Sequence, residues 1–237
     1  MPNPPPRVMV PELMDQPGLD PEDHAKALAG LRRINLLSGS AEQLWPAIRK
    51  HAIRTQWDRP LRVLDVACGG GDLLLRLGQK AKRAGIPVNL AGCDMSTQAL
   101  EISRVTLSRG GFSGEFHLCN VCEDPLPQGY DVITSSLFLH HLEEAQVVHV
   151  LSAMRESGAD LLVLSDILRS RLGLALAHTV PKLLSRSPIV HTDAVLSVRA
   201  SYTLEEIQRL AAAAALPHPR IRWSWPERFL LVWERGR

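Results

Sequence analysis

The sequence predicts an α/β fold in which a mostly parallel β-sheet is covered by helices on both faces. Between residues 60 and 165, short apolar runs alternate with segments of helical spacing, which is typical of parallel strands joined by crossover helices. Two of the runs, Val63–Val66 and Leu161–Leu164, are apolar almost throughout, as strands buried on both faces are. A chain of 237 residues that is 45% hydrophobic is long enough to bury such a core.

Residues 1–55 precede this alternation and are expected to form an N-terminal appendage. The proline-rich residues 1–21 are predicted to begin as an extended, partly mobile arm. Helical spacing then runs from Pro21 to about His51, where Asp20 can cap a first helix and Pro21 fits its first position. A second helix is predicted over Ala41–Arg54.

From residue 56 onward one larger domain is expected. Its first five strands are predicted at Arg62–Ala67, Val88–Cys93, Glu115–Cys119, Tyr130–Ser135 and Asp160–Ser165. Its helices are predicted at Asp72–Ala84, Thr97–Arg109 and Glu143–Glu156.

The last third breaks the alternation. Residues 169 to about 200 are predicted to be an inserted helical lid, interrupted by Pro181 and Pro188. A helix over Leu204–Ala215 follows a capping box formed by Thr203 and Glu206. Two strands, Arg220–Trp225 and Phe229–Glu234, are predicted to close the sheet as an antiparallel hairpin.

Charge and cysteine content narrow the classes of partner. The formal net charge is only +2, which gives no sign of the basic face that nucleic acid or an anionic membrane attracts. No apolar run reaches the length of a membrane span, and no secretory leader is recognised. Cys119 and Cys122 form an isolated pair without the second pair of a zinc site. We therefore expect a cytoplasmic protein with reduced thiols and no metal, and the sequence leaves monomer and homodimer open.

A glycine-rich turn is the sharpest feature. The strand that ends at Val66 runs through Ala67, Cys68 and Gly69 to Gly71, and a helix starts near Asp72. Ligands of open α/β sheets bind at the carboxyl ends of strands, and glycine lets the backbone approach them closely. The alternative is a tight turn that needs glycine only for its dihedral angles.

Two further polar residues follow successive strands. Asp94 ends the second strand, where a carboxylate can accept hydrogen bonds from both ribose hydroxyls of a nucleoside cofactor. Asn120 follows the third strand, where it can meet an adenine edge. Alternatively, Asp94 caps a helix that starts near Ser96, and Asn120 shapes a turn. A dinucleotide fingerprint would need a third glycine at Leu74, so pyrophosphate binding is disfavoured.

The string Asp65-x-Ala67-x-Gly69-x-Gly71 resembles motif I of the class I S-adenosylmethionine-dependent methyltransferases, usually written D/E-x-G-x-G-x-G. The resemblance covers about residues 60–170 and is strongest to methyltransferases of quinone and natural-product biosynthesis. It implies a Rossmann-like, seven-stranded sheet and S-adenosylmethionine as cofactor. The residues expected to bind the cofactor are Asp65, Ala67, Cys68, Gly69, Gly71, Asp94, Met95, Asn120, Val121 and Ser135. Ala67 replaces a glycine, which its methyl group allows if φ is negative there.

Methyl transfer to oxygen or nitrogen benefits from a base. His140 and His141 leave the fourth strand at its carboxyl end, and Asp166 ends the next strand, where it can orient a histidine, bind substrate or cap the following segment. Adjacent residues point in different directions, so one of the two histidines is expected to face the substrate. Catalysis by positioning alone is the alternative.

The resemblance also implies that residues 8–40 and 169–200 cover the acceptor site. Apolar side chains there favour a small aromatic or isoprenoid-like acceptor, such as a phenol or quinol, over nucleic acid. The residues expected to line this cover are Met9, Leu13, Met14, Leu172, Leu174, Leu176, His191, Thr192, Asp193 and Arg199. Two other functions stay open: an NAD(P)-dependent oxidoreductase, and a methyltransferase-like protein that binds without turnover.

Overall fold

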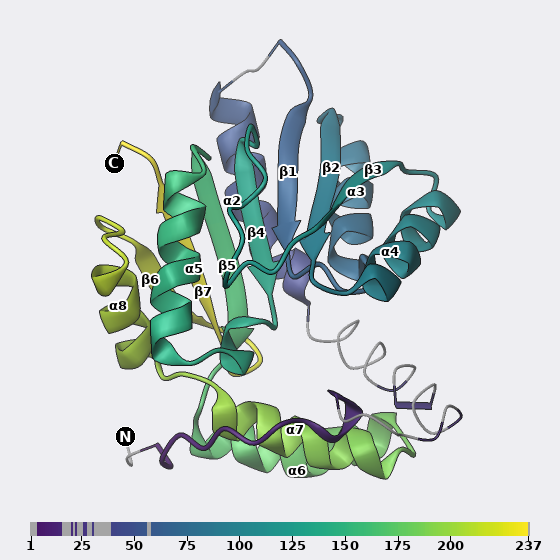
Figure 1. Cartoon of the computed structure of the whole chain (residues 1–237), viewed down its shortest axis with the longest axis vertical. Helices are drawn as coiled ribbons and strands as arrows, with labels where there is room; N and C mark the ends of the chain where they lie inside the picture. Colours follow the sequence, from purple (N-terminus) through teal and green to yellow (C-terminus); the bar gives the residue numbers. More distant parts are fainter. Residues whose placement is uncertain are drawn as a thin grey trace.

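The computed structural model describes residues 4–15, 20, 22, 26, 27, 30, 39–55 and 58–236. Its centre is a seven-stranded sheet with strand order β3-β2-β1-β4-β5-β7-β6 (Figure 1). The strands are β1 Leu61–Val66, β2 Val88–Asp94, β3 Gly114–Leu118, β4 Val132–Ser136, β5 Leu161–Ile167, β6 Arg220–Ser224 and β7 Arg228–Glu234. The first five are parallel, and β7 pairs antiparallel with both β5 and β6. The predicted fold class is confirmed.

Helices cover both faces of this sheet. The α-helices are α2 Ser40–Thr55, α3 Asp72–Arg83, α4 Thr97–Arg109, α5 Glu144–Glu156, α6 Arg171–Leu184, α7 Pro188–Ala200 and α8 Leu204–Ala213, and the 3₁₀ turns are η1 Leu13–Asp15 and η2 Leu139–His141. Apolar side chains of α2, α3 and α4 pack into one buried cluster, and those of α5 and α8 pack into a second cluster across the sheet. These two clusters hold the sheet between its helices.

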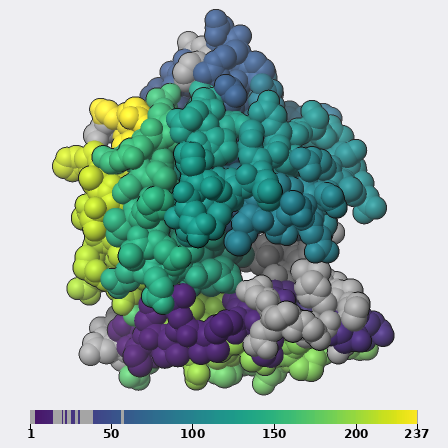
Figure 2. Space-filling model, viewed as in Figure 1, coloured from purple at the N-terminus to yellow at the C-terminus, as the bar shows by residue number. Residues whose placement is uncertain are grey.

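The helices α6 and α7 form a separate layer beyond the carboxyl ends of the parallel strands, and the N-terminal arm crosses that layer (Figures 1 and 2). The arm is extended, as predicted, but it is fixed in place. Arg7 donates hydrogen bonds to the carbonyls of Ala200 (2.6 Å) and Leu142 (2.8 Å), and the Val8 N–H donates to the Arg199 carbonyl (3.1 Å). The layer and the arm therefore enclose the edge of the sheet where ligands of this fold class bind.

Most predicted elements differ from the observed ones by only one or two residues at their ends. Pro181 is an exception, because it does not interrupt the lid but lies inside α6. It occupies the last turn, where its missing N–H removes one hydrogen bond, and its buried ring contributes packing in return. Pro188 does mark a break, as the first residue of α7. The helix predicted from Pro21 falls mostly outside the described residues.

The predicted capping box of α8 is present: the Glu206 N–H donates to Thr203 Oγ1 (3.2 Å), and the Thr203 N–H donates to the Glu206 carboxylate (2.8 Å). Among the helices that the structure describes, none has the length and apolar character needed to cross a bilayer.

Candidate active site

The turn after β1 is built on left-handed backbone. Ala67, Gly69 and Gly71 have φ of 55°, 51° and 77°. The condition of a negative φ at Ala67 is therefore not met, and its methyl group is accommodated at a strained position. At Gly71 a Cβ would lie 2.9 Å from Ser103 Oγ, whereas at Gly69 it would meet nothing within 4 Å. Gly71 thus serves close packing on α4, and Gly69 faces open space.

Asp94 connects this turn to the end of β2. One carboxylate oxygen accepts the Gly69 N–H (2.9 Å), and the other accepts the Ser96 N–H (3.0 Å). The carbonyl of Asp94 accepts the Cys119 N–H at the end of β3 (3.0 Å). Three successive strand ends therefore meet at one residue, Asp94, and the remaining lone pairs of its carboxylate can still accept hydrogen bonds.

Asp65 is a buried carboxylate beneath the turn. It is 2% exposed and accepts a hydrogen bond from Thr134 Oγ1 (2.8 Å). Burial, with a smaller contribution from Asp94, raises the pKa of Asp65 to about 7. A carboxylate in this state is stabilised by any cation that comes within contact distance, so its surroundings favour a ligand with an ammonium group.

Other predicted cofactor residues lie near this turn but use their side chains within the protein. Asn120 Oδ1 accepts the Cys122 N–H (3.2 Å), as in a turn. The Ser135 hydroxyl is buried and donates to the Val66 carbonyl (2.9 Å), and the Cys68 thiol faces Ser103. Val121 is buried in the core, whereas Met95 is 71% exposed beside Asp94.

His140 and Asp166 form a buried pair at the carboxyl ends of β4 and β5. The His140 ring atom Nδ1 lies 2.8 Å from Asp166 Oδ1, and the His140 backbone N–H donates to the other carboxylate oxygen (3.1 Å). Burial disfavours a protonated His140, but the charge and hydrogen bond of Asp166, with help from Glu12, outweigh it and raise the pKa of His140. Asp166 therefore fixes the Nδ1 side of this ring, and the other ring nitrogen, Nε2, lies 3.9 Å from a carboxylate oxygen of Glu12.

His141 is exposed at the rim, and its ring centroid lies 4.1 Å from that of His140. Crowding by neighbouring protein atoms and the charge of His140 lower the pKa of His141. The two histidines thus differ in surroundings: His140 is buried and hydrogen-bonded, and His141 lies at the surface.

Two residues near His140 were not predicted from the sequence. Glu12, on the arm, places a carboxylate oxygen 3.9 Å from His140 Nε2 and accepts a hydrogen bond from Ser197 of α7. Arg228 of β7 is 1% exposed and acts on Asp166 through its charge. An arginine at the start of an otherwise apolar strand was a signal for Arg228, but nothing local marks Glu12. The ligating atoms of Glu12, His140 and His141 lie within 4.8 Å of one another, a donor set that suits a metal ion.

The lid residues are only partly arranged as expected. Asp193 is buried, and its carboxylate accepts the backbone N–H groups of Leu13 (2.7 Å) and Met14 (3.1 Å), so it holds the arm. His191 Nε2 lies 2.8 Å from the Ser185 carbonyl. Leu172 is 54% exposed and does not line a covered pocket. Its position follows from the packing of α6 against α7, since the buried residues of α6 lie away from Leu172.

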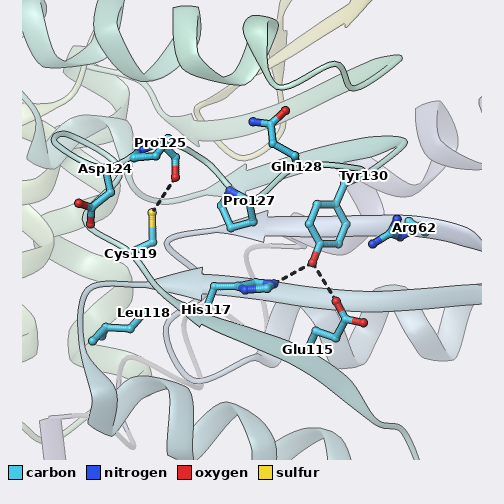
Figure 3. A pocket seen from close by; sticks show the side chains of 10 residues that line it. All are labelled: Arg62, Glu115, His117, Leu118, Cys119, Asp124, Pro125, Pro127, Gln128 and Tyr130. Carbon is cyan, nitrogen blue, oxygen red and sulfur yellow. Dashed lines mark hydrogen bonds between the residues drawn. The ribbon is translucent and has the colours of Figure 1, made fainter.

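A separate cavity of about 610 Å³ lies between β3 and the loop that leads to β4 (Figure 3). The Tyr130 hydroxyl donates to the Glu115 carboxylate (3.1 Å) and lies 2.8 Å from His117 Nε2. Burial and Glu115 raise the pKa of Tyr130 to about 12. No predicted site residue lines this cavity, so it is distinct from the site at the carboxyl edge.

Residues 63–158 match a family model that describes a methyltransferase domain. This match covers about two fifths of the chain and agrees with the resemblance inferred from Asp65, Gly69 and Gly71.

Two relatives match over part of this chain. "Ribosomal RNA small subunit methyltransferase C" of Citrobacter koseri is 33% identical over 111 residues, which are 44% of this chain and 31% of that protein. "Ubiquinone biosynthesis O-methyltransferase" of Thiobacillus denitrificans is 33% identical over 101 residues, which are 41% of this chain and 40% of that protein. The chain thus spans less than half the length of these relatives.

Solved structures share the fold of the methyltransferase domain and its additions. The plantazolicin methyltransferase BpumL, solved with a pentazolic desmethylPZN analog and SAH, superposes with a TM-score of 0.65 at 15% identity, covering 92% of both chains. An O-methyltransferase family 2 protein from Planctomyces limnophilus, in complex with apigenin, gives a TM-score of 0.57 at 19% identity and covers 92% of this chain and 63% of that one.

Proposed function

We propose that this chain transfers a methyl group from S-adenosylmethionine to the oxygen of a small, mainly apolar acceptor such as a phenol or quinol. The observation that carries the proposal is that the turn at Gly69 and the His140–Asp166 pair lie at the same carboxyl edge of one sheet. A cofactor bound at the Gly69 turn would lie beside a base formed by the His140–Asp166 pair.

Asp65, Gly69 and Asp94 are the residues best suited to hold the cofactor. The buried Asp65 carboxylate suits its ammonium group, the open space over Gly69 admits its chain, and Asp94 retains lone pairs for ribose hydroxyls. We include the backbone of Ala67, Cys68, Gly71, Asn120, Val121 and Ser135, and the exposed side chain of Met95, in the proposed cofactor site.

His140 is the proposed general base. Its Nδ1–H donates to Asp166, so Nε2 carries the lone pair that accepts the proton of the acceptor hydroxyl. When bound, S-adenosylmethionine supplies an electrophilic methyl group that passes to the acceptor oxygen, while its sulfonium becomes a neutral thioether. Asp166 then stabilises the imidazolium. Alignment of the cofactor with the acceptor accelerates the reaction further.

An oxygen acceptor is supported by the O-methyltransferases among the relatives and structural neighbours. The ribosomal RNA methyltransferases favour RNA as a second candidate, although the net charge of +2 offers little attraction to it. Incubation with radiolabelled cofactor and either ribosomal RNA or a panel of phenols separates the two. Label in RNA alone would exclude the small-molecule proposal.

Thermal unfolding tests the cofactor itself. S-adenosylhomocysteine should raise the midpoint, because a ligand that binds only the folded state stabilises it by about 2.7 kcal/mol at roughly one hundred times its Kd. NADH serves as the comparison. Stabilisation by NADH alone would favour an oxidoreductase over a methyltransferase. Stabilisation by S-adenosylhomocysteine without turnover on any acceptor would favour a binding protein without catalytic activity.

A further inference from the structure

One exposed side of α6 is apolar except for Thr179. Leu172, Val180 and Leu183 are 54%, 36% and 84% exposed, and Leu176 is half-buried beside them. Their spacings of four, four and three residues place them on one stripe along the helix. The adjoining side of α6 carries Gly173, Ala177 and Pro181, which are buried. We call the four exposed and half-buried residues the α6 stripe.

The charged side chains of α6 itself all have one sign. The sequence of α6 contains no aspartate or glutamate, and it carries Arg171 in its first turn and Lys182 in its last. Arg186, in the following loop, is exposed as well. On a helical wheel with about 100° per residue, Lys182 and Arg171 lie roughly 115° and 135° from the centre of the stripe, on the side away from the buried residues, with Thr179 and Ala175 in between. A helix with an apolar stripe bordered by basic residues is the type that lies in the interface of an anionic membrane.

We propose that the α6 stripe docks this protein on the surface of an anionic lipid bilayer. The leucines enter the boundary between headgroups and acyl chains, and Lys182 and Arg186 remain at the level of the lipid phosphates. With 14 residues, α6 is too short to span the bilayer and lies parallel to its plane.

A second copy of the chain fits the α6 stripe less well than lipid does. A two-fold contact would bring Lys182 and Arg171 of both copies together, and like charges oppose such a contact. Four apolar side chains are also far fewer than the roughly 20–30 residues a side of a stable interface. A bilayer needs no shape complementarity, and its phosphates attract the bordering charges.

The position of α6 would bring the candidate site close to the membrane surface. The α6–α7 layer lies beyond the carboxyl ends of the parallel strands, where His140 and Asp166 are located (Figure 1). An apolar acceptor dissolved in the bilayer would therefore reach the protein on the side that carries the candidate site. The docking itself requires neither cofactor nor acceptor, so it stands independently of the proposed methyl transfer.

Co-sedimentation of the full chain with lipid vesicles tests the proposal. We expect binding to vesicles that contain phosphatidylglycerol and, on phosphatidylcholine alone, binding weaker by at least about tenfold. The double variant Leu172→Ser/Leu183→Ser should weaken binding by about 100-fold, because two apolar side chains no longer enter the bilayer. Lys182→Glu should weaken it by about tenfold, and more salt should weaken the wild type.

The control is Ile53→Ser/Val105→Ser, which replaces two exposed apolar residues (52% and 48%) on α2 and α4, away from the stripe. It should bind vesicles as the wild type does, and circular dichroism checks that every variant is folded. Equal binding to both lipid mixtures, or equal binding by the Leu172/Leu183 variant, would overturn the proposal. A dimer in sedimentation velocity that this variant converts to a monomer would assign the stripe to a second copy instead.

Discussion

His140 is the proposed proton acceptor, so its replacement should lower turnover without changing the affinity for the cofactor. His140→Ala should lower turnover by about 10²–10⁴-fold and leave the affinity for S-adenosylhomocysteine unchanged, since the ring does not enter the proposed cofactor site. His141→Ala is the matched control and should stay near the wild-type rate. Turnover assays and calorimetry make the comparison. Near-normal rates in both variants would leave positioning as the whole mechanism.

The pH dependence has a defined sign. A base must be neutral to act, and Asp166 and Glu12 outweigh burial to raise the pKa of His140 above 6.5. The rate should therefore rise with pH through a midpoint above 6.5. The same group stabilises the fold below pH 6.5 and loses that contribution as pH rises through the folded pKa.

Asp65 should couple cofactor binding to pH. Burial raises its pKa to about 7, and the ammonium of the cofactor favours its ionised form, so binding below pH 7 releases a proton. The affinity for S-adenosylhomocysteine should rise by up to about tenfold per pH unit until about pH 7 and then level off. Asp65→Asn should remove this slope in calorimetric titrations. A wild-type affinity independent of pH would contradict the role.

Ala67 tests the strain in the turn. Left-handed backbone costs alanine about 1–2 kcal/mol, and replacement by glycine removes this strain. Glycine also makes the unfolded chain more flexible, which cancels roughly half of the stability gained. Ala67→Gly should raise the free energy of unfolding in urea by about 0.5–1 kcal/mol. Ala84→Gly, at a residue with φ of −88°, should lower it instead. A loss at Ala67 equal to that at Ala84 would mean that the methyl group contributes packing.

Among the elements, the 3₁₀ turn η1 of the arm is held by the carboxylate of one residue. Asp193 of α7 receives the N–H groups of Leu13 and Met14, so Asp193→Ala leaves both without a partner and should cost about 1–3 kcal/mol of local stability. Limited proteolysis should then cut within residues 4–15 faster than in the wild type. Asp193→Asn keeps one acceptor oxygen and should give an intermediate rate. Unchanged cleavage would show that Arg7 and Val8 suffice to hold the arm.

The sequence predicted those elements whose signals are local. The boundaries of α4 and the capping box of α8 follow from apolar spacing and from the pair Thr203 and Glu206, which lie within one turn of each other. Asp94 and Asp166 were placed correctly because strand ends of a parallel sheet share an edge. Glu12 and the left-handed φ of Ala67 were missed, since both depend on contacts between distant parts of the chain or on the exact turn geometry.

At the scale of the whole molecule, the sheet order differs from the chain order at its antiparallel end. The hairpin was predicted, but its arrangement beside β5 was not, because the sequence does not say which of its strands is inner. The structure places β7 between β5 and β6, and β7 is buried along its entire length. The positions of Arg228 and of its neighbour Asp166 both follow from this arrangement.

Truncation after Trp225 should therefore remove more than one strand. β6 pairs only with β7 in the described sheet, so loss of β7 detaches β6 and opens the edge of β5. We expect insoluble or aggregated protein on expression, because an exposed apolar edge pairs with other chains. A soluble truncated chain with a cooperative melting transition would contradict this expectation.

The inner position of β7 also orders the events of folding. β6 is synthesised first yet has no place to attach until the strand behind it in the sequence has docked on β5. Assembly at this end of the sheet must therefore wait for the ribosome to release β7, and a nascent chain stalled just before Arg228 would be a natural substrate for chaperones.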